Sequence, residues 1–168
     1  MRSPLWGVSG WQVAVLALTR VGAVLGVSFT HRRYLGRALK RNDSLIDLNL
    51  RLNRLDDEGG RMLFEGLRNN ASVTALNVCS NAMQGESAKA LAVCLSNPEC
   101  ALVSVDMSGN RLNESDADLL KDALQESVSL TALDLRANPD IPASSDALAE
   151  ILSSAYYVQI LQDLNEEA

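Results

Sequence analysis

Hydrophobic positions recur in a fixed order along this chain from residue 45 onward. The stretch from Leu45 to Leu67 has the pattern L-x-x-L-x-L-x-x-N-x-L-x-x-x-G-x-x-x-L-x-x-G-L. Three further copies begin at residues 73, 102 and 130. The copies align on their central strand positions and on one asparagine each: Leu48, Leu76, Val105 and Leu133, and Asn53, Asn81, Asn110 and Asn138. Agreement at this many positions indicates four structural repeats.

Each repeat predicts one short strand followed by one helix. The L-x-L core alternates, so it predicts a strand with one buried face. The asparagine predicts a turn, because its side chain satisfies backbone groups at a bend. The second half, residues 57–67 in the first copy, has apolar residues at helical spacing. One such unit cannot bury its own apolar face, and stacked units can, so the copies predict a solenoid.

A period of 28 to 29 residues with L-x-x-L-x-L-x-x-N resembles the leucine-rich-repeat signature. The repeat length is similar to that of the ribonuclease-inhibitor-like subclass. This resemblance implies an α/β leucine-rich-repeat solenoid with a parallel concave sheet and outer helices.

The ends of the chain depart from the repeat pattern. Residues 1–30 form an atypical apolar segment with Arg20 inside its most apolar run, 11–29. A central arginine disfavours a membrane span, and no clear cleavage site favours a secretory signal. The segment is interpreted as a degenerate repeat, with a strand at 13–18, or as sequence that is not native protein. Four divisions follow: 1–30, a basic helix ending a partial repeat at 31–43, four repeats at 44–152, and a C-terminal capping helix and tail at 153–168.

The charge distribution bears on the class of partner, and the cysteines bear on metal binding and on the redox compartment. Residues 1–43 carry seven Lys and Arg against one acidic residue, whereas residues 44–168 carry eight against twenty. An acidic solenoid repels phosphate, so nucleic acid is not expected as its partner, and a basic protein surface is. The three cysteines, Cys79, Cys94 and Cys100, show no metal-binding spacing and fit a reducing compartment. Cys94 is predicted in the core and Cys79 on the strand surface.

Strand residues between the buried leucines are predicted to face outward on the concave sheet. Across the copies they form three columns. The first is Asp47, Ala75, Ser104 and Ala132; the second is Asn49, Asn77, Asp106 and Asp134; the third is Arg51, Cys79, Ser108 and Arg136. The candidate protein-binding residues are Asp47, Asn49, Arg51, Asn77, Cys79, Ser104, Asp106, Ser108, Asp134 and Arg136. A solvated polar face with no partner is the competing interpretation.

The sequence predicts no catalytic, cofactor-binding or metal-binding site. The single histidine, His31, lies outside the repeats with no nucleophile placed for it. Acidic residues such as Asp57 and Glu58 are explained by their place at a helix start. Gly59 and Gly60 are expected in a strand-to-helix turn and do not form a phosphate-binding loop.

Two segments are similar to one family within the leucine-rich-repeat class. SLIDLNLRLNRLDDEGG at 44–60 and LTALDLR at 130–136 resemble the C-terminal repeats of the dynein regulatory complex subunit 5 family, the T-complex-associated testis-expressed proteins. The resemblance covers residues 44–160; residues 1–30 do not match. It implies a non-enzymatic scaffold subunit of the nexin link in the axoneme of cilia and flagella, held by other protein subunits in the cytoplasm.

Two other functions are weighed against this one. A soluble leucine-rich-repeat regulator or inhibitor of an enzyme or GTPase is the main alternative. A membrane-tethered receptor-type protein is the third possibility, and it requires residues 11–29 to cross a membrane. Because Arg20 within this segment disfavours a span, a membrane partner is not expected.

Overall fold

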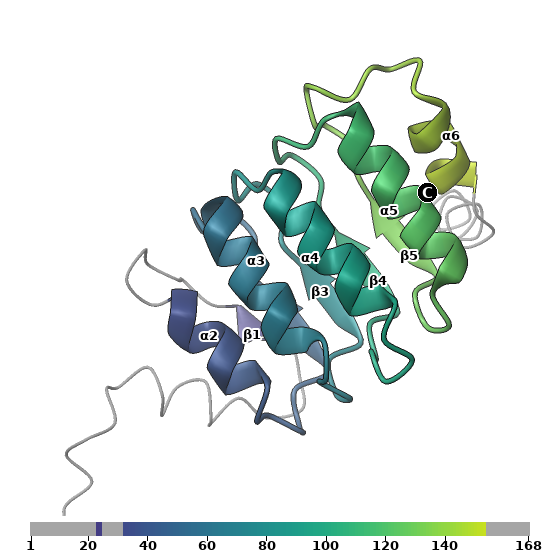
Figure 1. Ribbon diagram of the computed structural model, residues 1–168. Coiled ribbons are helices and arrows are strands. Elements are labelled where there is room, and N and C mark those ends of the chain that lie inside the picture. Colours follow the sequence, from purple (N-terminus) through teal and green to yellow (C-terminus); the bar gives the residue numbers. More distant parts are fainter. Residues whose placement is uncertain (1–22, 25–31, 154–168) are drawn as a thin grey trace, which may run out of the picture.

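The computed structural model describes residues 23–24 and 32–153, in which strands and helices alternate (Figure 1). The strands are β1 (Ala23–Val24), β2 (Asp47–Asn49), β3 (Ala75–Asn77), β4 (Ser104–Asp106) and β5 (Ala132–Asp134). The helices are α2 (Arg32–Leu39), α3 (Asp56–Leu67), α4 (Gly85–Leu95), α5 (Glu114–Glu126) and α6 (Asp146–Ser153). These elements repeat the strand-then-helix order that the sequence predicts.

The strands form one parallel sheet in the order β1-β2-β3-β4-β5, and helices α2 to α5 lie side by side on one face of it (Figure 1). Leu48 pairs with Leu76, Leu76 with Val105, and Val105 with Leu133, so equivalent positions of the four repeats lie next to one another. The predicted α/β leucine-rich-repeat solenoid, with a parallel sheet and outer helices, is therefore confirmed.

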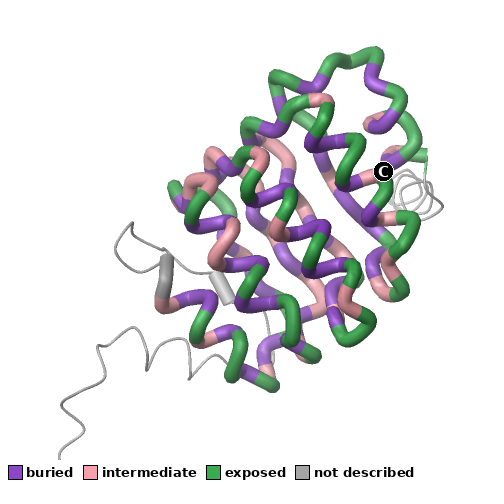
Figure 2. Tube along the Cα trace, viewed as in Figure 1, coloured by how far each residue is buried: buried purple, intermediate pink, exposed green. Residues whose placement is uncertain are grey.

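The core lies between the sheet and the helices. Leu48, Val105 and Leu133 are almost fully buried in it, and Phe64 is the one aromatic residue among the largest fully buried side chains described. Figure 2 shows buried positions facing inward along every helix while exposed positions face outward. Burying each such aliphatic side chain contributes about 1.5–3 kcal/mol, so the stacked units supply to one another the apolar contact that a single unit lacks.

Three sequence expectations meet the structure at the edges of the repeats. The strand expected at 13–18 lies outside the described residues; the strand that pairs with β2 is β1, at Ala23–Val24. The C-terminal capping helix and tail expected at 153–168 lie, apart from Ser153, outside the described residues; the last described helix is α6 (Asp146–Ser153). The expected turn at Gly59 and Gly60 is wrong. Both lie inside α3, where a Cβ at Gly60 would stand 2.1 Å from Ser87 Oγ, so the glycine allows α3 and α4 to approach closely.

The repeat asparagines form a ladder of hydrogen bonds that joins each unit to the next. Asn81 Oδ1 accepts from the backbone N–H groups of Asn53 and Leu55, in the preceding unit, at 3.2 Å each. Its Nδ2 donates to the carbonyls of Leu50 and Val78 at 2.8 and 3.0 Å. Asn110 and Asn138 repeat this arrangement one and two units further on. The asparagine therefore satisfies buried backbone groups of two units at once.

The residue before each ladder asparagine adopts a left-handed backbone conformation. These residues are Leu52, Ser80, Gly109 and Ala137, with φ between 56° and 64°. Only Gly109 adopts this conformation without a side-chain penalty; for the other three it costs about 1–2 kcal/mol each. The turn is fixed by the asparagine hydrogen bonds beside it, which hold the backbone in place whichever residue precedes them.

Asp57 connects two helices. It lies in the first turn of α3, but its carboxylate accepts backbone N–H groups at the start of α4, from Gln84 at 2.9 Å, Ser87 at 2.8 Å and Glu86 at 3.1 Å. Partial burial alone would raise the pKa of Asp57, but these hydrogen bonds outweigh it and hold the pKa below its usual value of 3.8.

Replacing Asp57 by alanine is expected to lower the free energy of unfolding by about 1 kcal/mol at neutral pH, because α4 loses its N-terminal cap. The pKa of Asp57 is lower in the folded state than in the unfolded state. Its stabilising contribution is therefore fully present at pH values above the unfolded-state pKa, and it is lost as the pH falls through the folded-state pKa. Urea unfolding at several pH values should show the gap between wild type and variant closing below about pH 4. Asp118→Ala, at an exposed position of α5, is the control, and it should change the free energy of unfolding only slightly at every pH. If the loss of stability caused by Asp57→Ala stayed constant down to strongly acidic pH, the role assigned to Asp57 would be contradicted.

Candidate protein interface on the concave sheet

The sheet face opposite the helices carries the first two predicted columns in strict register, and the third column lies in the turns two residues after the strands. Asp47 pairs with Ala75, Ala75 with Ser104, and Ser104 with Ala132, and the second column aligns in the same way. Asp47 is exposed, Ala75 and Ser104 are half-buried, and Ala132 is buried. The structure thus brings the candidate residues of β2 to β5 onto one surface. Exposure in the first column therefore falls from Asp47 on β2 to Ala132 on β5, and the small residues of this column are not equally accessible on every strand.

The side chains of the second column stabilise the turns that follow their own strands. Asn49 Oδ1 accepts the N–H of Arg51 at 3.0 Å, and Asn77 Oδ1 accepts that of Cys79 at the same distance. Asp106 and Asp134 accept from Ser108 and Arg136 in the same way, both at 2.9 Å. Each side chain therefore fixes the strand exit two residues later.

Two of these residues also contact each other across strands. Asn77 Nδ2 donates to Asp106 Oδ2 at 2.9 Å, and Ser108 Oγ donates to Asp106 Oδ1 at 2.6 Å. A partner that binds Asp106 would therefore meet a carboxylate that is already positioned by three protein donors, the third being the N–H of Ser108. Such preorganisation lowers the entropic cost of binding.

The third column places one arginine at each end of the surface. Arg136 is held by Asp134, with its Nη2 2.6 Å from Asp134 Oδ2, whereas exposed Arg51 makes no side-chain ion pair among the described residues. The surface pair is worth at most about 1 kcal/mol, so a partner can open it at little cost. Asp47 on β2 and Arg51 in the turn after it are exposed charged groups that make no ion pair among the described residues.

Sequence reasoning missed a second row of polar turns, at the ends of the helices. Asn42, Asn70 and Ser127 each accept the N–H group three residues further on, at 2.8, 2.8 and 3.1 Å. The signal was present, because each stands three positions before the first apolar residue of a repeat. These contacts stabilise the turns that lead from each helix into the next strand, and they do not involve the candidate binding residues.

The cysteines divide into a buried pair and one on the sheet. Cys94 Sγ lies 3.4 Å from Cys100 Sγ, and both side chains are buried, as predicted for Cys94. The hydrogen bond from Cys94 lowers the pKa of Cys100 to about 7, while the same bond and burial raise the pKa of Cys94. Cys79 is half-buried on the concave side, with its thiol 3.2 Å from Ser80 Oγ.

Ellman's reagent is expected to react rapidly with one thiol per native chain, that of Cys79. The thiolate character of Cys100 favours reaction, but its side chain is only 2% exposed, so the reagent cannot reach the sulfur without local opening. Unfolding in guanidinium should release the other two thiols, and Cys79→Ser should remove the fast phase. Rapid reaction of three thiols in the native chain would contradict the buried placement of Cys94 and Cys100.

The described residues show no arrangement typical of catalysis by a metal. No group of three or more His, Cys, Asp or Glu side chains within them is placed to hold a metal ion. None of the helices between residues 32 and 153 has both the length and the apolar character that a membrane crossing needs.

Comparisons with known proteins agree with the repeat architecture. A family model described as "Leucine Rich repeat" matches residues 41–64 and 69–92, which contain β2, β3 and the greater part of α3 and α4. No curated protein matches the chain. The repeat match and the topology together establish a leucine-rich-repeat fold.

Solved structures similar to this chain include two from proteins of the tropomodulin and leiomodin type. "Leiomodin-1 Actin-Binding Site 2" is 16% identical, with a TM-score of 0.63, and the match covers 94% of this chain and 93% of that one. The tropomodulin C-terminal domain of Caenorhabditis elegans is 21% identical, with a TM-score of 0.65, over 95% of this chain and 99% of that one. At such identities the likeness concerns the fold. None of these findings supports the dynein regulatory complex family specifically.

Proposed function

We propose that this chain is a non-enzymatic protein-interaction scaffold that binds its partner on the concave sheet. The observation that carries the proposal is the alignment of six candidate residues on β2 to β5, with four more in the turns that follow the strands, on a sheet face that no described helix covers. Solenoids of this class use their concave side for binding. This surface offers a partner its shape and its charge, and we propose that it acts through these alone.

The partner that this surface fits is a protein with basic and hydrogen-bonding groups. Asp47 is exposed at one end, and Asp106 lies fixed in the middle by its contacts to Asn77 and Ser108. Residues 44–168 as a whole carry twenty acidic against eight basic side chains, so a basic partner is attracted over a distance as well as at contact.

We infer a cytoskeletal setting for this scaffold. The resemblance at 44–60 and 130–136 favours the axonemal dynein regulatory complex of cilia and flagella, where other subunits would be the partners. The similar structure titled as an actin-binding site of leiomodin-1 favours actin as a second candidate partner. A soluble regulator or inhibitor of an enzyme or GTPase is the alternative if neither assembly retains the chain.

Localisation of the tagged chain in ciliated cells tests this setting. A signal in the axoneme that survives detergent supports the scaffold role, diffuse cytosolic signal supports the soluble regulator, and a signal released by detergent supports membrane attachment. Co-sedimentation of the purified chain with actin filaments and with isolated axonemes separates the two cytoskeletal candidates. Sedimentation with neither, together with diffuse signal, would overturn the cytoskeletal setting.

Reversing one concave charge, Asp47→Lys, is expected to weaken retention on the assembly that binds the chain by at least about tenfold, or 1.4 kcal/mol. Asp47 is exposed and its side chain holds no turn, so the fold should be unaffected. The control is Asp122→Lys, which makes the same change in charge at an exposed position of α5, on the helix side of the molecule. Equal weakening by both variants would show that overall charge, and not the concave face, determines binding.

A further inference from the structure

A groove runs along the helix layer, on the side of the molecule opposite the concave sheet. It lies mainly between α3 and α4 and has a volume of about 490 Å³. We call it the helix groove; it is lined by Lys40, Arg61, Phe64, Glu65, Arg68, Asn69, Glu86, Lys89, Ala90 and Val93. A second hollow of about 340 Å³ between α2 and α3 adjoins it and shares Lys40, Arg61 and Glu65.

Small residues create this hollow surface. Gly36 and Gly66 bring α2 and α3 so close that a Cβ at Gly66 would stand 2.3 Å from the Gly36 carbonyl oxygen. On α4, Ala90 lies where a longer side chain would fill the space beside α3. The depression thus results from the packing of the helices.

The charges of the helix groove do not cancel. Glu65 is paired with Arg61, and Glu86 is paired with Lys89 at 2.9 Å. Arg61 is also bound by Glu58 at 2.6 Å. Exposed Lys40 and Arg68 make no ion pair with any described residue, so two positive charges remain for a ligand.

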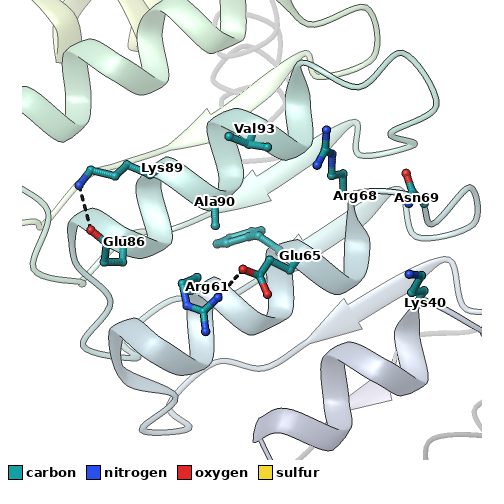
Figure 3. A pocket seen from close by; sticks show the side chains of 10 residues that line it. Lys40, Arg61, Glu65, Arg68, Asn69, Glu86, Lys89, Ala90 and Val93 are labelled. Atoms are coloured by element: carbon teal, nitrogen blue, oxygen red, sulfur yellow. Dashed lines mark hydrogen bonds and ion pairs between the residues drawn. The ribbon is translucent and has the colours of Figure 1, made fainter.

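The two unpaired cations lie at one end of the groove, beside an apolar side chain. Figure 3 shows Lys40, Arg68 and Asn69 toward one end and the Lys89–Glu86 pair toward the other, with Val93 near Arg68. Val93 is 51% exposed, whereas Leu91, Cys94 and Leu95 of the same helix are buried in the core. Exposed valine next to unpaired cations gives this end of the groove both a charged and an apolar contact.

We propose that the helix groove is a second docking site, for an acidic protein segment that carries an aliphatic side chain. Carboxylates of the segment would pair with Lys40 and Arg68, and its aliphatic side chain would cover Val93 and Ala90. The charge complementarity is local, because the repeats around the groove are acidic and repel such a segment elsewhere. α3 spans roughly 18 Å at 1.5 Å per residue, enough for about three turns of a bound helix. The site is separate from the concave surface and does not depend on what binds there.

A purely structural role for the two cations predicts a different result. Lys40 follows the C-terminus of α2 and Arg68 caps that of α3, where positive charge stabilises a helix. Removing the charges would then change stability without changing affinity for an acidic ligand. Binding and unfolding are therefore measured on the same variants.

The probe is a fluorescein-labelled peptide of repeated Glu-Glu-Leu, titrated with the full chain by fluorescence anisotropy and by amide chemical shifts. We expect binding that shifts amides of residues 61–69 and 86–93 and weakens in high salt. The double variant Lys40→Glu, Arg68→Glu should weaken it at least about tenfold. Arg54→Glu, Arg111→Glu carries the same charge change at exposed positions outside the groove and should retain most of the affinity.

Apolar contact is tested separately. Val93→Ser should weaken the Glu-Glu-Leu peptide several-fold, whereas Val128→Ser, at a valine that is 76% exposed outside the groove, should not. A Glu-Glu-Ser peptide should bind less tightly than Glu-Glu-Leu. The proposal is overturned if no groove amide shifts at millimolar peptide, or if both double variants lose affinity equally. It is also overturned if a thymidine oligonucleotide binds as tightly as the peptide and Val93→Ser has no effect, because the groove would then be a general anion site.

Discussion

Replacing Asn110 by alanine is expected to lower the free energy of unfolding by about 3–5 kcal/mol, a large part of what a domain of this size has. The side chain is 2% exposed and makes hydrogen bonds in both directions. Its Oδ1 accepts the N–H groups of Asn81 and Met83 at 3.0 and 3.1 Å, and its Nδ2 donates to the carbonyls of Val78 and Met107 at 3.1 and 2.8 Å. Alanine leaves two buried N–H groups without a partner, at about 1–3 kcal/mol each. Urea or guanidinium unfolding measures the loss.

An exposed asparagine three positions later provides the matched control. Asn113 caps α5 and accepts the N–H of Asp116 at 3.2 Å in a capping box. Asn113→Ala should cost about 1 kcal/mol, the usual value for a helix cap. Equal losses at the two positions would mean that the ladder contributes no more than a single cap, and would contradict the role given to it here.

The second large effect is expected at Gly66, where α2 and α3 touch. A methyl group at this position would meet the Gly36 carbonyl oxygen at 2.3 Å and its Cα at 2.6 Å, both backbone atoms that cannot turn aside. Gly66→Ala should therefore cost about 1–3 kcal/mol or displace α2 altogether, uncovering Leu35 and Leu39. Hydrogen exchange is the measurement, because it reports on each helix separately.

The exchange pattern distinguishes local from global damage. In a solenoid each unit contacts only its neighbours, so amides of α2 should lose protection while those of α4 and α5 keep theirs. Gly85→Ala is the control: its Cβ would approach only a side-chain oxygen of Asp116, at 3.1 Å. Uniform loss of protection from α2 to α5, or no loss at α2, would contradict the close contact.

The spacing of the leucines and asparagines was sufficient to predict the sheet and its register. Leu48, Leu76, Val105 and Leu133 could be aligned by counting, and stacking then required equivalent positions to pair. The same counting placed Asp47 and Asn49 on the outer face of the sheet. Whether a partner binds there stays a prediction, because no pattern within one chain contains the shape of another.

Other features could not be obtained from the pattern, for identifiable reasons. The left-handed turn residues differ in type, from leucine at 52 to glycine at 109, because the asparagine after them fixes the turn. Gly60 was misplaced in a turn because glycine usually marks one; here it lies where two helices touch. The helix groove depends on which cations are already paired, as Arg61 is and Arg68 is not, and pairing is a property of three dimensions.

The direction of the asparagine ladder has a consequence for the order in which the protein is made. Asn81 accepts N–H groups of the turn that contains Asn53, and Asn110 accepts N–H groups of the turn that contains Asn81. These N–H groups are therefore satisfied by a side chain about one repeat downstream, although the same asparagines also bind carbonyls of their own unit. A unit that has just left the ribosome is therefore incomplete until its successor emerges. Consolidation of the nascent chain trails translation by one unit, and a message cut short at any repeat boundary leaves the last unit unfinished.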